Sequence, residues 1–185
     1  MIYLVGGASR AGKSTLARRL VQQQGIPYFP IDALMMAFAN GYAAFGMDPN
    51  TPSETRGEQL WPILRALAVN LLEEERTHPT YLLEGDELLP KYVAELSSAY
   101  PGQVRACFIG YTRAAPAEKL QQVRQAEPDW NTWCPDQDVL AFLAYSVRFS
   151  RYLESECAAY GLPYFDGSDD FARATEEAGA YLLAG

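Results

Sequence analysis

The stretch Gly7-Ala8-Ser9-Arg10-Ala11-Gly12-Lys13-Ser14 decides the fold of this chain. It matches the pattern G-x-x-x-x-G-K-[ST] at every fixed position. The apolar run 2–5 before it predicts a strand, and the run 15–21 behind it places apolar side chains on one helical face. A strand, a glycine-rich turn and a helix are the context that gives this pattern its meaning.

The residue types of this stretch suit a bound polyphosphate. Glycines let the chain turn tightly, so that successive N–H groups point into one concave nest, and the following helix adds the positive end of its dipole. We expect Lys13 to reach the β- and γ-phosphates and the Ser14 hydroxyl to ligate Mg²⁺. The alternative is a chance glycine-rich turn with a surface lysine, which the flanking pattern disfavours. The residues expected to bind the nucleotide here are Gly7, Ala8, Ser9, Arg10, Ala11, Gly12, Lys13, Ser14 and Thr15.

The composition predicts one soluble domain that covers residues 1–185. A chain of 185 residues with 49% hydrophobic and 21% charged residues can bury a sizeable core. Its net charge of -8 disfavours nucleic-acid and anionic-membrane surfaces as partners, because both need a basic face. The sequence leaves open whether the protein is a monomer or a homodimer.

The cysteines and the chain start favour a cytoplasmic location. Cys107, Cys134 and Cys157 are widely spaced and odd in number, so they suggest neither a disulfide framework nor a metal site. No apolar stretch is long enough to span a membrane, and the glycine-rich motif begins too early to leave room for a signal peptide.

Strand and helix patterns alternate along the rest of the chain. Further strands are expected at 27–31, 80–83, 104–109 and 163–165, and helices at 33–39, 62–76, 88–99, 116–126, 138–160 and 170–183. Pro62 either opens its helix or lies inside a helix that begins near Ser53. This alternation predicts a parallel sheet with helices on both faces.

Polar residues follow the expected strands, and ligands of such sheets bind outside the carboxyl ends of the strands. The polar residues at these ends are Asp32, Glu84-Gly85-Asp86-Glu87, Thr112-Arg113 and Asp166-Gly167-Ser168.

This layout resembles the P-loop kinases of the nucleoside and adenylate kinase superfamily. A Walker A motif opens the chain, Asp32 follows the second strand, Glu84-Gly85 follows the third, and a lid-like segment spans about 127–137. The stretch 83–90, Leu-Glu-Gly-Asp-Glu-Leu-Leu-Pro, is similar to the E-G-x-x-x-x-P stretch of 2-phosphoglycerate-kinase-like proteins. Chloramphenicol phosphotransferase and zeta-type toxins are other members. The resemblance implies a three-layer α/β/α fold with a five-stranded parallel sheet in the order 2-3-1-4-5 and a small lid.

The chain also departs from particular members of that superfamily. It has no D-G-[FY]-P-R after the third strand, which argues against adenylate kinase itself, and no D-x-D after the second, which argues against shikimate kinase. The absence of N-K-x-D disfavours a Ras-like GTPase.

The resemblance implies roles for the acidic residues. Asp32 would accept the proton of the acceptor hydroxyl or orient it, although it could instead cap the helix at 33–39. Glu84 would hold Mg²⁺ through water or contact the acceptor, or belong to an acidic surface turn with Asp86 and Glu87. Asp86 and Met35 are further candidates for the acceptor site, which is expected within about 32–61.

The resemblance implies roles for residues late in the chain as well. Arg124, Arg148 and Arg151 flank the expected lid and would close on the phosphates, unless they form ordinary surface ion pairs. Asp166 and Gly167 lie where related kinases bring backbone to the adenine, although Ser168 or Asp169 could simply cap the last helix. Trp130 and Trp133 would cover a substrate or anchor the lid.

The sequence therefore predicts an ATP- and Mg²⁺-dependent kinase that phosphorylates a hydroxyl of a small molecule. A nucleotide-binding switch that hydrolyses ATP slowly is the alternative from another class. A nucleotide or nucleoside kinase and a toxin-type kinase acting on a sugar nucleotide also stay open. The acceptor itself is not identified by the sequence.

Overall fold

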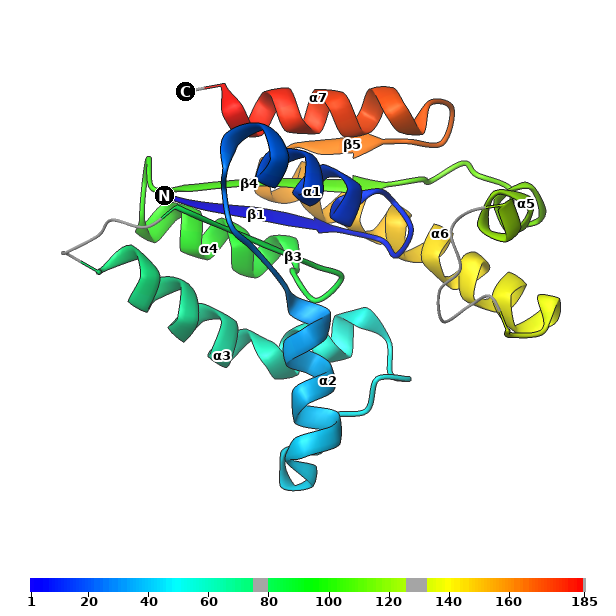
Figure 1. Ribbon diagram of the computed structural model, residues 1–185, viewed down its shortest axis with the longest axis horizontal. Helices are drawn as coiled ribbons and strands as arrows, with labels where there is room; N and C mark the ends of the chain where they lie inside the picture. Colours follow the sequence, from blue (N-terminus) through cyan, green and yellow to red (C-terminus); the bar gives the residue numbers. More distant parts are fainter. Residues whose placement is uncertain (75–79, 126–132, 185) are drawn as a thin grey trace.

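The strand that leads into the glycine-rich stretch lies at the centre of a five-stranded sheet (Figure 1). The structure is a computed structural model that describes residues 1–74, 80–125 and 133–184. All strand pairs are parallel and the order is β2-β3-β1-β4-β5, which confirms the predicted topology. The strands are β1 (Ile2–Gly7), β2 (Tyr28–Pro30), β3 (Tyr81–Gly85), β4 (Val104–Gly110) and β5 (Tyr164–Asp166).

Helices cover both faces of the sheet, as the alternating pattern predicts. The α-helices are α1 (Lys13–Gln24), α2 (Ile31–Gly41), α3 (Ser53–Leu72), α4 (Pro90–Ala99), α5 (Pro116–Gln125), α6 (Asp136–Tyr160) and α7 (Phe171–Leu183). A 3-10 turn, η1 (Ala43–Phe45), follows α2. Helices α1 and α7 pack together on one face, whereas α3, α4 and α6 contact the strands from the other.

The core is built from the central strands and the helix faces turned toward them. Ile2, Leu4 and Val5 of β1 are fully buried, as expected for a central strand of a parallel sheet that is covered on both faces. A smaller apolar cluster, made of Val123, Val139 and Leu143, joins α5 to α6. The sheet therefore fixes the ends of its strands rigidly, whereas α5 depends mainly on α6 for its position.

The structure decides two questions about helix starts that the sequence left open. Helix α3 begins at Ser53 and contains Pro62, which confirms the alternative that places the proline within the helix. Helix α7 is capped by Asp170, whose carboxylate accepts a hydrogen bond from the Arg173 N–H, and not by Ser168 or Asp169. In the part of the chain that the structure describes, no helix is long and apolar enough to cross a membrane.

Candidate active site

The glycine-rich stretch, which we call the P-loop (residues 7–14), curls at the carboxyl end of β1. Gly12 has a φ of 101° and Arg10 a φ of 62°, both in the left-handed region. A Cβ on Gly7 would lie 2.2 Å from the carbonyl oxygen of Ile109, so only glycine allows this approach to β4. The first N–H groups of α1, which belong to Lys13, Ser14 and Thr15, have no acceptor within the helix. The loop therefore has the curled backbone of a phosphate nest.

Lys13 is held inside this loop by two acceptors. Its Nζ donates to the carbonyl oxygen of Ala8 at 2.9 Å and to Oδ1 of Asp86 at 2.5 Å. The side chain is 8% exposed, and burial by itself would lower its pKa. The carboxylates of Asp86 and Glu84 outweigh that effect and raise the pKa of Lys13, so the ammonium stays charged. Lys13 is thus a fixed positive charge next to the nest.

Ser14 and Glu84 form an oxygen pair beside Lys13. The Ser14 hydroxyl donates to Oε1 of Glu84 at 2.9 Å, and Glu84 itself is only 6% exposed. Burial raises the pKa of Glu84 more than the nearby ammonium of Lys13 lowers it. A carboxylate and a hydroxyl are hard oxygen donors, which fit Mg²⁺ in a site where phosphates and water supply the other ligands.

Asp32 lies in the first turn of α2, and not at its cap. The N-cap position is held by Pro30 and no side chain caps the helix, so the capping alternative for Asp32 is wrong. Burial is the largest effect that raises the pKa of Asp32, and the negative charge of Asp86 adds to it. The positive charges of Lys13 and Arg56 oppose the rise. Asp32 is therefore close enough to the P-loop lysine for each charge to shift the pKa of the other group.

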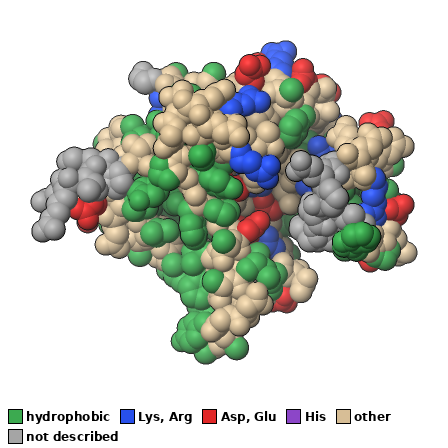
Figure 2. All heavy atoms as spheres, viewed as in Figure 1, with side chains coloured by type: hydrophobic (Ala, Val, Ile, Leu, Met, Phe, Trp, Pro, Cys, Tyr) green, Lys and Arg blue, Asp and Glu red, His purple; other side chains and the backbone are tan. Residues whose placement is uncertain are grey.

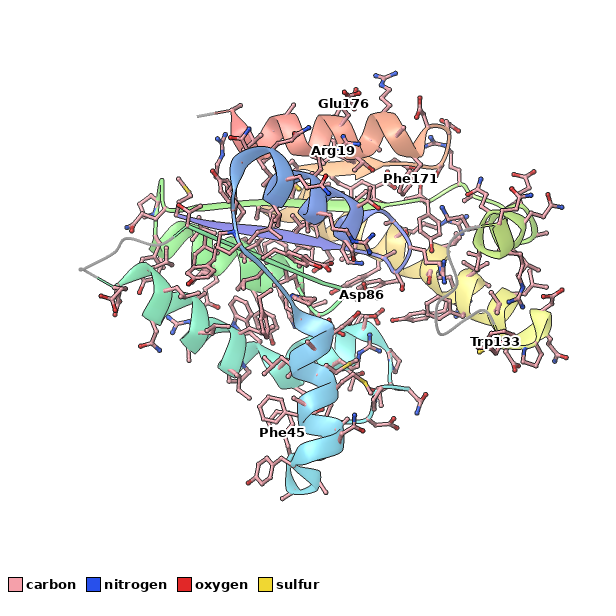
Figure 3. The ribbon with its side chains drawn as sticks, viewed as in Figure 1. Arg19, Phe45, Asp86, Trp133, Phe171 and Glu176 are labelled. Carbon is pink, nitrogen blue, oxygen red and sulfur yellow. The ribbon has the colours of Figure 1, made fainter. Side chains whose placement is uncertain are left out.

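A cavity of about 650 Å³ opens next to the P-loop. Its lining comes from the P-loop, α2, the turn after β3, the segment before α3, the start of α3, and the start of α6 with the segment before it. The lining residues are Ser9, Asp32, Met35, Met36, Pro49, Asn50, Thr51, Pro52, Ser53, Arg56, Asp86, Cys134, Asp138, Val139, Phe142 and Tyr145. Asp86 contacts Lys13 and also lines this cavity, so it joins the P-loop to the large cavity. Figure 3 shows Asp86 in the middle of this region, between the starts of α1 and α2.

Charged side chains of both signs meet near the centre of this face of the molecule, whereas hydrophobic side chains gather below them (Figure 2). Another pair of opposite charges is buried at the wall of the large cavity. Arg56 donates from Nε to Oε1 of Glu87 at 2.9 Å, and Glu87 is fully buried. Sequence analysis did not identify Arg56, because nothing in a helical stretch marks which arginine will turn inward.

A second cavity, of about 360 Å³, lies on the other side of the P-loop. It is lined by Arg10, Gly12, Lys13, Ser14, Thr15, Lys119, Gln122, Val123 and Phe171. The Lys119 ammonium lies 4.7 Å from the ring centre of Tyr111 and 5.5 Å from that of Phe171. Burial lowers the pKa of Lys119, and Arg10 adds to that effect. Lys119 and Phe171 also escaped the sequence analysis, since each is an ordinary helix residue until the fold is known.

The three candidate arginines do not line either cavity. Arg124 donates to Asp136 at 2.7 Å and to the carbonyl of Cys134 at 2.6 Å. Arg148 lies over the Tyr145 ring at 5.9 Å, and Arg151 donates from Nε to the Thr112 carbonyl at 2.9 Å. Their expected closure on phosphates stays a prediction.

Asp166 and Gly167 tie the ends of β4 and β5 together. Asp166 accepts a hydrogen bond from the Thr112 hydroxyl, and the Gly167 N–H donates to the Gly110 carbonyl at 2.8 Å. Neither residue is among those that line the two cavities described here. Their expected contact with adenine also stays a prediction.

Most of the expected lid at 127–137 falls outside the described residues, including Trp130. Trp133 is described and is 88% exposed, close to the start of α6 in Figure 3. Its ring is therefore largely surrounded by solvent, and Trp133 lines neither of the two cavities.

Comparisons with known proteins support the fold. A gluconokinase from Sinorhizobium meliloti 1021 superposes with a TM-score of 0.60 at 19% identity, covering 97% of this chain and 90% of that one. A shikimate kinase from Bacteroides thetaiotaomicron gives 0.55 at 14% identity, covering 98% and 96%. A sugar kinase from Janibacter sp. HTCC2649 gives 0.54 at 18% identity, covering 98% and 93%. No family model matches the chain, and neither does any curated protein sequence. The chain thus has the three-layer fold of P-loop small-molecule kinases.

Proposed function

We propose that the protein is an ATP- and Mg²⁺-dependent phosphotransferase that acts on a hydroxyl of a small molecule. One observation carries the proposal: Asp86 contacts the P-loop lysine and also lines the large cavity in which Asp32 lies. A donor site and an acceptor site would then share one wall. A cavity of about 650 Å³ is within the size range of small-molecule sites.

Each residue near the P-loop would have a defined task. Lys13 would bind the β- and γ-phosphates, exchanging its contact with Asp86 for a phosphate oxygen. Ser14 and Glu84 would hold Mg²⁺, which when bound neutralises charge on the phosphates. Asp32 would accept a hydrogen bond from the acceptor hydroxyl and take its proton, a role that a raised pKa favours. The second cavity, with Phe171 beside it, would take the nucleoside.

A nucleotide switch fits the large cavity less well. A switch needs only a water-positioning group near the γ-phosphate, whereas this cavity extends from Asp86 to Phe142 and Tyr145 on α6. The solved structures with this fold that are named above are a gluconokinase, a shikimate kinase and a sugar kinase, which favours the same conclusion.

Transfer of labelled phosphate tests the proposal. The protein is incubated with Mg²⁺, γ-labelled ATP and a pool of small hydroxyl metabolites, and the label is followed by chromatography. We expect label in a new organic phosphate with the wild type and with Lys91→Ala, whose lysine pairs with Glu58 away from the P-loop. Lys13→Ala should lower ATP affinity by about a hundredfold, or about 3 kcal/mol, in calorimetry. Release of all label as inorganic phosphate would favour the switch instead.

A further inference from the structure

The charges on the wall of the large cavity are unevenly distributed. Its acidic lining residues are Asp32, Asp86 and Asp138, and its basic lining residue is Arg56. An acceptor that enters this cavity would therefore meet three carboxylates among the described lining residues, and one of them, Asp86, is paired with Lys13 at 2.5 Å until a phosphate takes its place. Whether it can carry a negative charge depends on whether Arg56 is available to it.

Arg56 is already occupied by the protein. Besides the bond to Glu87, its Nη1 donates to the carbonyl oxygens of Pro49 and Thr51, and its Nη2 donates to the Ser53 hydroxyl at 3.1 Å. Four donated hydrogen bonds use most of the five N–H groups of a guanidinium. The side chain is only 11% exposed. Arg56 thus stabilises the cavity wall and has few N–H groups left to donate to an anion inside the cavity.

Much of the rest of the wall is apolar or is engaged within the protein. Met35 and Met36 line the α2 side, and Val139 and Phe142 line the α6 side. The Tyr145 hydroxyl accepts from the Ser53 N–H at 2.6 Å and donates to Glu54 at 2.9 Å, so it too is engaged. Such walls favour an acceptor with an apolar body.

Asp138 differs from the other two acids. It lies in the first turn of α6, and its side chain is exposed. Among the described residues it has no ion-pair partner. A carboxylate in that position can meet a cationic group of a ligand whose body fills the cavity.

We propose that the acceptor is an alcohol with an apolar body that carries no anionic group, and that a protonated amine on it is recognised by Asp138. This inference rests on the proposed function and names the substrate class of that same site. An anionic acceptor would bring a further negative charge among these carboxylates and beside the ATP phosphates. Among the described lining residues there is no uncommitted guanidinium to pair with it.

Three probes with the same phenylpropyl body test the proposal. They are 2-amino-3-phenylpropan-1-ol, which is cationic, 3-phenylpropane-1,2-diol, which is neutral, and 3-phenyllactate, which is anionic. Each is titrated calorimetrically into the protein with Mg²⁺ and a non-hydrolysable ATP analogue, and again without nucleotide. We expect the cationic probe to bind about tenfold more tightly than the anionic one, with the diol between them.

Variants assign the preference to a residue. Asp138→Asn should reduce the affinity for the amino alcohol to that for the diol and leave the diol unchanged. Glu154→Gln, an exposed carboxylate further along α6, is the matched control and should change neither. Tighter binding of 3-phenyllactate, or no binding of any probe, would overturn the inference. Failure of the ATP analogue to bind would instead contradict the proposed function, and the titrations without nucleotide would still report on the cavity.

Discussion

Glu87 is a buried acid with an unusual environment. Its Oε1 accepts from Arg56, whereas its Oε2 is buried without a hydrogen-bond partner among the described residues. Burial, together with Asp86 and Asp32, raises the pKa of Glu87 to about 7, against the opposing effect of Arg56. Glu87 should therefore hold its proton in the folded protein at a pH where it would have lost it in the unfolded chain.

The pH dependence of stability tests this assignment. Between pH 4.5 and about 7 the folded state binds more protons at Glu87 than the unfolded state, so its contribution to the free energy of unfolding falls as pH rises. In urea denaturation, the free energy of unfolding of the wild type should fall by about 3 kcal/mol relative to that of Glu87→Gln over that window. Parallel pH profiles for the two proteins would show that Glu87 titrates normally.

Sequence analysis identified the residues whose roles are local in the chain. Lys13 and Ser14 belong to one motif with its flanking strand and helix, and Glu84 ends a recognisable strand, so their meeting at one sheet edge could be predicted. The positions of Arg56 and Lys119 could not be predicted, because they depend on which face of each helix packs toward the rest of the protein.

At the scale of elements, the start of α3 shapes the large cavity. Gly57 lies so close to the turn after β3 that a Cβ there would be 2.7 Å from the Glu87 carbonyl oxygen. This contact and the Arg56 hydrogen bonds join α3, the segment 49–53 and the β3–α4 turn. The cavity wall therefore forms as one unit.

Replacing Arg56 by lysine should loosen that unit. A lysine cannot reproduce the several hydrogen bonds of the guanidinium, so Arg56→Lys should cost about 2 kcal/mol in chemical denaturation. Hydrogen exchange should quicken at residues 49–53. The matched control on the same helix is Arg65→Lys, whose exposed pair with Glu95 should be worth less than about 0.5 kcal/mol. Equal losses in both variants would contradict this role for Arg56.

The periodic patterns predicted the type of every strand and helix better than their limits. The apolar spacing after Pro62 indicated the second part of α3, while the first part has a buried face that only packing reveals, at Ser53, Gly57 and Leu60. The capping assignments failed at α2 and α7, since several neighbouring acids could each have capped the helix.

At the scale of the whole molecule, the sheet order brings the two cavities to one edge. The order 2-3-1-4-5 followed from the family resemblance, because alternation alone predicts a parallel sheet without its order. The expected acceptor segment 32–61 supplies only part of the lining of the large cavity, and much of the rest comes from α6. Residues so distant in sequence have no local signal that they will meet.

The central claim is that the P-loop and the large cavity are the donor and acceptor halves of one transfer site. Asp32→Asn tests it most directly, because the change keeps the shape of the side chain and removes the base. Calorimetry with the ATP analogue and Mg²⁺ is paired with transfer of labelled phosphate to the metabolite pool. The account predicts ATP affinity close to that of the wild type and transfer reduced on the order of a hundredfold. Full transfer by Asp32→Asn would contradict it.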